Sequence, residues 1–139
     1  MKAFIATALL AAASGATATR VAYALPYGSK DTRLTDTSCG SGTNGLTTKY
    51  GWQTIGDIPA KYVGGASDIN KYNSDQCGNC YRIDYNSKTV YMLAIDFAGN
   101  GLNIAQGGLD ELTNGNAYNL GTIDATVTKV DTTFCLTGH

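Results

Sequence analysis

Alternation of apolar and polar residues is the main pattern along this chain, and it predicts short β-strands. Tyr81–Tyr85 alternates, and the β-branched, apolar run Thr89–Asp96 follows it. Between them, Asn86–Lys88 is a set of turn residues, so the two strands are expected to form a hairpin. Ile123–Val130 alternates in the same way and predicts a last strand.

The N-terminal half contains shorter predicted elements, separated by glycine- and asparagine-rich turns. Arg20–Leu25 predicts a first strand, and Leu46–Tyr50 predicts another short strand. Ile55–Tyr62 contains Pro59 and predicts a loop or a single helical turn. The pair Gly64-Gly65 predicts a break in the chain.

Helical spacing of apolar residues occurs in one segment, 102–112, which predicts a helix despite its two internal glycines. Asn114-Gly115-Asn116 is expected to end this helix. Many short strands with one clear helix indicate a small, mainly β barrel or sandwich. The pattern alone does not choose between these two architectures.

The first 18 residues have the pattern of a secretory signal peptide. Lys2 supplies a positive charge, Ala3–Ala13 is almost wholly apolar, and Ala16-Thr17-Ala18 is an A-x-A cleavage pattern. The apolar run is too short for a membrane span, which needs roughly 20 residues. We therefore expect residues 1–18 to be removed and residues 19–139 to form one secreted domain.

Charge and composition exclude several partner classes. Without Lys2, nine basic residues face eleven acidic ones, so no nucleic acid partner is expected. No segment of residues 19–139 is apolar enough to predict membrane insertion.

Four cysteines, Cys39, Cys77, Cys80 and Cys135, predict two structural disulfides with three possible pairings. Neither a metal site nor a cofactor is expected, because a structural zinc site usually needs two close cysteine pairs, or one with histidines, and the chain has a single histidine. A redox role is disfavoured because the secretory context favours permanent bridges.

Nine tyrosines, one tryptophan and many side-chain amides suit a surface that binds carbohydrate, although strand propensity also explains tyrosines.

Asp96 ends an apolar strand, so its carboxyl group is expected either to meet a ligand at the rim or to cap a turn. The chain has only one glutamate, Glu111, whereas glycoside hydrolysis generally needs two flanking carboxylates. No catalytic residue is therefore expected, and Asp96 is the one candidate if there is any.

Several segments, in order, resemble the cerato-platanins, small secreted proteins of filamentous fungi. The matching segments are Ser38-Cys39, Gly42-Thr43-Asn44-Gly45-Leu46, Tyr50-Gly51-Trp52-Gln53-Thr54, Gly64-Gly65, Cys77-Gly78-Asn79-Cys80-Tyr81, Leu93-Ala94-Ile95-Asp96, Leu112-Thr113-Asn114 and Gly121-Thr122-Ile123-Asp124-Ala125. Together they span essentially all of residues 19–139.

The resemblance implies a six-stranded double-psi β-barrel with one or two short helices and with bridges Cys39–Cys77 and Cys80–Cys135. It also implies a protein of fungal cell walls and culture fluid that binds chitin (N-acetylglucosamine) oligomers and acts on plants as an elicitor or phytotoxin. Asp96 matches the position of a functional aspartate in the similar barrels of expansins and small endoglucanases. Two departures, Ala24 after Tyr23 and Phe97 after Asp96, remove a partner acid and a histidine that many relatives carry there.

Asp96, Tyr23, Asn44 and Asn100 are the expected carbohydrate contacts. The leading hypothesis is a non-hydrolytic binder of chitin or another wall polysaccharide, a monomer with self-assembly left open and a plant receptor as a possible partner. The alternatives are an expansin-like wall-loosening protein or weak glycan hydrolase that uses Asp96, and a surface-active or immune-recognised protein that requires no ligand.

Overall fold

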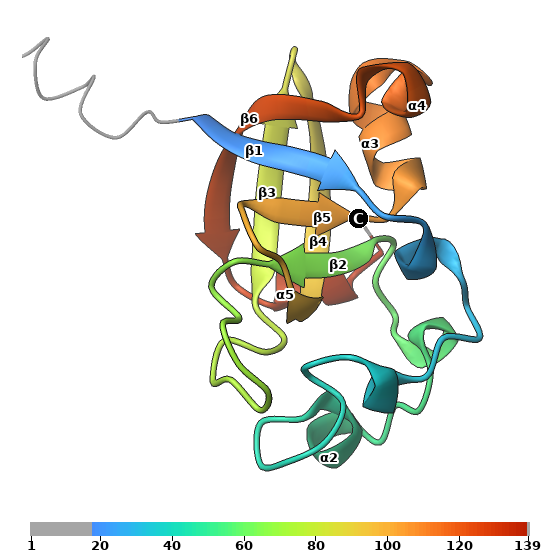
Figure 1. Ribbon diagram of the computed structural model, residues 1–139, viewed down its shortest axis with the longest axis vertical. Helices are drawn as coiled ribbons and strands as arrows, with labels where there is room; N and C mark the ends of the chain where they lie inside the picture. The colour runs from blue at the N-terminus through green and yellow to red at the C-terminus, as the bar shows by residue number, and fades with distance from the viewer. Residues whose placement is uncertain (1–17, 139) are drawn as a thin grey trace, which may run out of the picture.

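The computed structural model describes residues 18–138. The predicted signal peptide lies outside the described residues except for Ala18, with which the first strand begins. Six strands close into a barrel in the order β1-β5-β2-β4-β3-β6, as Figure 1 shows. They are β1 (Ala18–Tyr23), β2 (Val63–Ala66), β3 (Cys80–Tyr85), β4 (Lys88–Phe97), β5 (Leu102–Ile104) and β6 (Thr122–Val130).

The barrel combines parallel and antiparallel strand pairs, and each parallel pair requires a crossover connection. β1 pairs with β5 and β2 with β4 in parallel, whereas the other four neighbouring pairs are antiparallel. This is the six-stranded double-psi β-barrel that the family resemblance implies. The predicted β3–β4 hairpin is confirmed, and Asn86 (φ 47°) and Ser87 (φ 66°) form its two-residue turn.

Helices are short and lie outside the barrel. The four α-helices of the described residues are α2 (Leu46–Tyr50), α3 (Gln106–Thr113), α4 (Ala117–Leu120) and α5 (Thr133–Leu136). Three 3₁₀ turns accompany them, η2 (Leu25–Gly28), η3 (Leu34–Asp36) and η4 (Ile55–Asp57). The expectation of one or two short helices was therefore too low, although only α3 exceeds five residues.

Three element predictions were wrong. Leu46–Tyr50 is the helix α2, because Gly51 adopts the left-handed conformation (φ 77°) that closes a helical turn. The predicted helix 102–112 begins only at Gln106, because Leu102 and Ile104 both point into the barrel from β5. Gly64-Gly65 lies within β2 rather than in a break.

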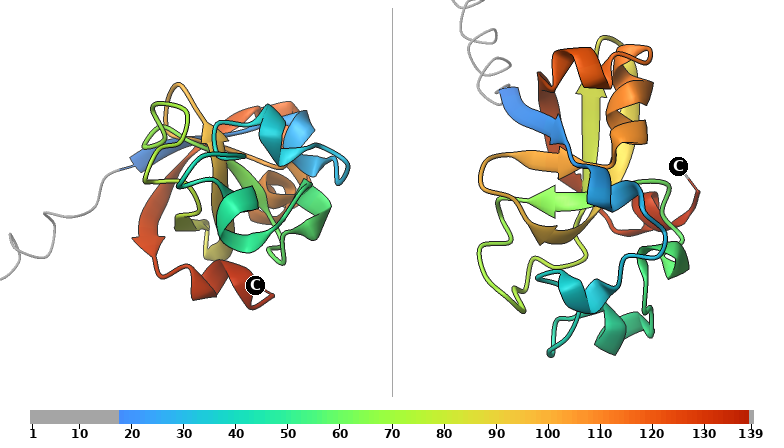
Figure 2. Two further views of the ribbon diagram at one scale, coloured as in Figure 1. Left: turned by 90° about the horizontal axis from the view of Figure 1, so that it is seen from below. Right: turned by 45° about the vertical axis from the view of Figure 1, so that its right-hand side comes forward.

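The long connection between β1 and β2 forms η2, η3, α2 and η4. It carries α2 to one end of the barrel, whereas α3, α4 and the β3–β4 hairpin turn lie toward the opposite end (Figures 1 and 2). The bridges Cys39–Cys77 and Cys80–Cys135 are present, as the resemblance implies. Cys39–Cys77 ties the first long loop to the segment before β3, and Cys80–Cys135 ties β3 to α5.

Candidate functional site

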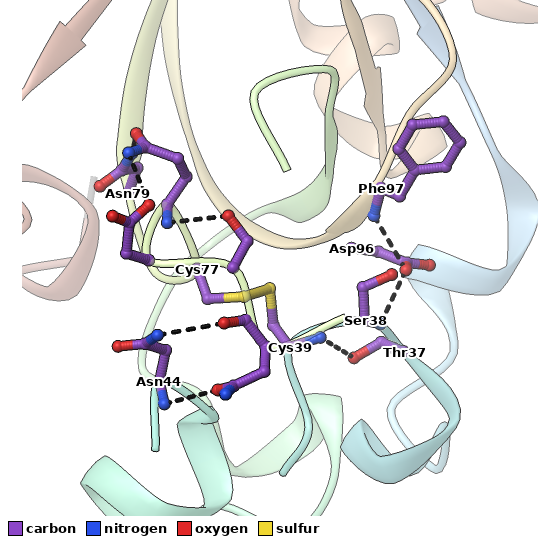
Figure 3. Close-up of a disulfide and its surroundings, with 12 residues drawn as sticks. Thr37, Ser38, Cys39, Asn44, Cys77, Asn79, Asp96 and Phe97 are labelled. Carbon is purple, nitrogen blue, oxygen red and sulfur yellow. Dashed lines mark hydrogen bonds between the residues drawn. A yellow bond between two sulfur atoms is a disulfide. The ribbon is translucent and has the colours of Figure 1, made fainter. Parts of the chain in front are cut away.

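Asp96 is the penultimate residue of β4, and its half-buried carboxylate accepts three hydrogen bonds. Oδ1 accepts the backbone N–H groups of Ser38 and Phe97, each at 2.9 Å (Figure 3). Oδ2 accepts the hydroxyl of Tyr27 at 3.0 Å. The carboxylate therefore holds the barrel rim, the first long loop and η2 together.

Tyr27 reaches Asp96 because Gly65, the neighbour of Asp96 on β2, has no side chain. A Cβ at Gly65 would lie 3.2 Å from the Tyr27 hydroxyl and 2.8 Å from the carbonyl oxygen of Phe97. Burial, followed by the negative charge of Asp96, raises the pKa of Tyr27 well above its ordinary value. Tyr27 therefore keeps its proton at physiological pH and acts as a hydrogen-bond donor to Asp96.

Asn44 is fixed by a second set of hydrogen bonds, to Asn73 in the loop before β3. The backbone N–H of Asn44 donates to Asn73 Oδ1 at 2.7 Å, and Asn44 Nδ2 donates to the Asn73 carbonyl at 3.0 Å. Asn73 adopts a left-handed conformation (φ 58°), which asparagine tolerates better than most residues. The two asparagines thus join two loops that are far apart in sequence.

Ser38 connects these two groups of hydrogen bonds. Its carbonyl accepts the N–H of Asn73 at 3.0 Å, while its own N–H donates to Asp96. The Cys39–Cys77 bridge lies beside this connection in Figure 3. Tyr27, Ser38, Asn44, Asn73 and Asp96 therefore form one hydrogen-bonded set, which we call the amide network.

Two of the four predicted contacts, Asp96 and Asn44, are joined through this network, and the other two are not. Tyr23 lies at the end of β1, two residues after the buried Val21, and packs half-buried against the core. Asn100 is exposed in the turn between β4 and β5. Among the described residues, neither side chain has a hydrogen bond to the network.

Sequence reasoning missed Tyr27, Ser38 and Asn73. Ser38 stood in the quoted motif next to Cys39, but its role is carried by backbone atoms, which no residue type reveals. Tyr27 comes close to Asp96 only through barrel closure, because the two residues are 69 positions apart.

Three aromatic rings lie on the same loops as the amide network, and those of Tyr50 and Tyr72 are exposed. Tyr50 stacks on Trp52 with 4.1 Å between ring centroids and 11° between planes, at the end of the short helix that follows Asn44. Tyr72 precedes Asn73, remains 57% exposed, and its hydroxyl hydrogen-bonds the hydroxyl of Ser41. Aromatic faces beside amides are suited to sugar rings.

The hydrogen-bond partners of Asp96 include no second carboxyl group within residues 18–138. Within residues 18–138, the hydrogen-bond partners of Asp96 are one hydroxyl and two backbone amides. Position 24, just after β1, is alanine. The same residues contain no group of three or more histidine, cysteine or acidic side chains that could hold a metal ion.

Fold and site together define a small, disulfide-bridged β-barrel protein with a loop surface of amides, aromatic rings and one fixed carboxylate. Residues 19–137 match the cerato-platanin profile, and the chain belongs to the cerato-platanin family.

Named relatives and solved structures agree with this assignment. Allergen Asp f 15 of Aspergillus fumigatus is 43% identical over 119 residues, covering 85% of this chain and 77% of that protein. The heat-stable 19 kDa antigen of Coccidioides immitis is 40% identical over 121 residues, covering 86% and 82%. The crystal structure of cerato-platanin 3 from M. perniciosa has a TM-score of 0.82 and 40% identity, covering 86% of this chain and 98% of that one.

No helix among residues 18–138 combines the length and the apolar character needed to cross a bilayer.

Proposed function

We propose that this chain is a secreted protein of the fungal cell wall and surroundings that binds chitin (N-acetylglucosamine) oligomers at the amide network without hydrolysing them. In contact with plants it acts as an elicitor or phytotoxin. Membership of the cerato-platanin family supports the proposed elicitor or phytotoxin role.

The observation that carries the proposal is the unused hydrogen-bonding capacity of Asn44 and Asn73. The contacts between the two loops use Asn73 Oδ1 and Asn44 Nδ2. Within the described chain, the other side-chain atoms, Asn44 Oδ1 and Asn73 Nδ2, have no hydrogen-bond partner. An amide oxygen accepts from the N–H of an acetamido group, and an amide nitrogen donates to its carbonyl. The pair therefore offers the two complementary groups that N-acetylglucosamine requires.

Asp96 contributes an anchored acceptor, which Ser38 connects to Asn73. Its three hydrogen bonds fix the carboxylate in place before a ligand arrives, which lowers the entropic cost of binding. With alanine rather than an acid at position 24, the carboxylate is suited to accepting a sugar hydroxyl rather than to two-carboxylate hydrolysis. An open loop surface buries little ligand area, so the expected affinity is modest.

Titration with chitin hexamer, followed by ¹H–¹⁵N NMR, tests the binding. We expect the amide signals of Ser38, Asn44 and Asn73 to shift at millimolar ligand. Asp96→Asn keeps the shape of the side chain and is expected to weaken binding, whereas Asp124→Asn, an exposed aspartate on β6, leaves it unchanged. The proposal is wrong if none of the three amides shifts, or if both variants bind like the parent chain.

Release of reducing ends from chitin and β-glucan distinguishes the enzyme alternative. Sugar release that Asp96→Asn abolishes indicates a weak glycan hydrolase, and filter-paper disruption without sugar release indicates expansin-like loosening. Full leaf necrosis caused by a folded Asp96→Asn protein that no longer binds chitin indicates recognition by a plant receptor without a required ligand.

A further inference from the structure

Tyr27 also lines a hollow that the amide network does not use. The hollow has a volume of about 240 Å³ and lies between η2, η4, β2 and the start of α3. Its apolar lining includes Ile55, Val63 and Ala105, which are at most 6% exposed. The half-buried rings of Tyr27 and Tyr62 also line it. This combination is suited to a flat, apolar ring.

Two lysines line the same hollow, and only one of them is neutralised. Lys61 Nζ lies 2.9 Å from Glu111 Oε1 and 5.5 Å from the centre of the Tyr62 ring. Lys30 is exposed, and no carboxylate of residues 18–138 lies within ion-pair distance of its ammonium group. The hollow therefore has an apolar interior and one uncompensated positive charge.

We propose that this hollow binds a single-ring aromatic carboxylate, with the ring among the tyrosines and apolar side chains and the carboxylate at Lys30. The size fits, because a cavity of roughly 150 Å³ holds benzene and the remaining space takes a short acidic side chain. The charge fits, because Lys30 is the cation without an internal partner. A ligand of about eleven non-hydrogen atoms is expected to bind with a dissociation constant on the order of 1 mM.

The site is separate from the proposed chitin contacts but touches them through one residue. The ring of Tyr27 lines the hollow, while its hydroxyl donates to Asp96. A bound ring that moves Tyr27 therefore shifts the amide signal of Ser38, which donates to the same carboxylate. This inference does not depend on chitin binding.

Titration of the full domain with trans-cinnamate, followed by ¹H–¹⁵N NMR, tests the proposal. We expect the amides of Ala60, Tyr62 and Ala105 to shift most, and cinnamamide, its neutral analogue, to bind more weakly. Lys30→Gln is expected to weaken cinnamate binding about two- to fivefold, the range for an exposed ion pair. Lys49→Gln, an exposed lysine on α2, is the matched control and leaves the affinity unchanged.

Ala60→Phe tests the location, because Ala60 is half-buried in the lining and a phenyl group there fills the hollow. We expect this variant to lose cinnamate binding. Lys30→Gln changes only an exposed side chain, so the test remains valid even if Ala60→Phe does not fold. The proposal is overturned if no amide near the hollow shifts at 10 mM cinnamate (about ten times the expected dissociation constant), if cinnamamide binds equally well, or if Lys30→Gln and Lys49→Gln behave alike.

Discussion

The hydroxyl of Tyr27 donates to Asp96 Oδ2 at 3.0 Å, although the two residues are 69 positions apart in the sequence. The bond joins η2 to the end of β4 beside Gly65, where a Cβ would lie only 3.2 Å from the Tyr27 hydroxyl. Of the residues in the amide network, Tyr27 also lines the hollow between η2, η4, β2 and the start of α3. Asp96 therefore has a structural role in addition to any role in binding.

Removal of this hydroxyl is expected to destabilise the fold. Tyr27→Phe deletes a half-buried hydrogen bond to a carboxylate, which contributes about 1 to 2 kcal/mol. Chemical denaturation measures the loss, with Tyr118→Phe as the control because Tyr118 on α4 is 79% exposed. Equal stability of the two variants would contradict the structural role of the Tyr27–Asp96 bond.

Both glycines of β2 leave no room for a Cβ, and the contact at Gly64 is the tighter one. A Cβ there would lie 2.1 Å from the carbonyl oxygen of Asn103 on β5, which is backbone and has no room to move. Gly64→Ala should therefore cost at least about 3 kcal/mol or abolish folding.

Gly28 provides the matched control for Gly64. Its Cβ would meet no atom of the described chain within 4 Å, so Gly28→Ala should change the free energy of unfolding by no more than about 0.5 kcal/mol. Thermal unfolding of both variants measures this difference in stability. A stable Gly64→Ala protein would mean that β2 and β5 lie farther apart than the structure has them.

Much of the barrel was predictable because its long strands carry their own pattern. β3, β4 and β6 alternate or are rich in β-branched residues, and all three were predicted within two residues of their observed ends. β2 was missed because its glycines allow neighbouring strands to approach closely. The sequence alone does not distinguish such glycines from those of a turn. β5 was missed because its two inward residues also fit the helical spacing of the residues that follow.

The candidate site was predictable only in part, for a related reason. Asp96 and Asn44 could be named because a carboxylate at a strand end and an amide in a glycine-rich turn are local signals. Their connection depends on backbone atoms of Ser38 and on Asn73, which only the closed barrel brings near. The cysteine pairing likewise required the family resemblance, since counting left three alternatives.

Alkaline pH is expected to destabilise the protein through three tyrosines that donate to carboxylates. Tyr27, Tyr62 and Tyr81 donate to Asp96, Glu111 and Asp68, and burial together with these acids raises the pKa of each hydroxyl above 10.0. Below pH 10 both the folded and the unfolded chain hold these protons, so the contribution to stability is complete.

Above pH 10 the unfolded chain releases protons that the folded chain retains, so the free energy of unfolding falls as pH rises toward the folded-state pKa values. Urea midpoints between pH 8 and 11.5 should show a plateau followed by a decline that begins near pH 10. A variant with Tyr27, Tyr62 and Tyr81 all changed to Phe should decline less. A constant midpoint up to pH 11.5 would rule out the raised pKa values.

The two disulfides are expected to contribute similarly to stability but differently to binding. They close loops of 38 and 55 residues, so each stabilises the fold by about 4 kcal/mol in the chain-entropy model. Removal of either bridge by paired Cys→Ala changes should therefore lower the urea midpoint by a comparable amount.

Only the Cys39–Cys77 bridge lies beside the amide network, whereas Cys80–Cys135 holds α5 against β3. Given the proposed chitin site, Cys39→Ala/Cys77→Ala should weaken chitin-hexamer binding under conditions where the protein is folded, because Ser38 and the loop of Asn73 lose their covalent tie. Cys80→Ala/Cys135→Ala is the matched control, of similar stability, and should bind like the parent chain. Equal binding by both variants would place the chitin site elsewhere on the barrel.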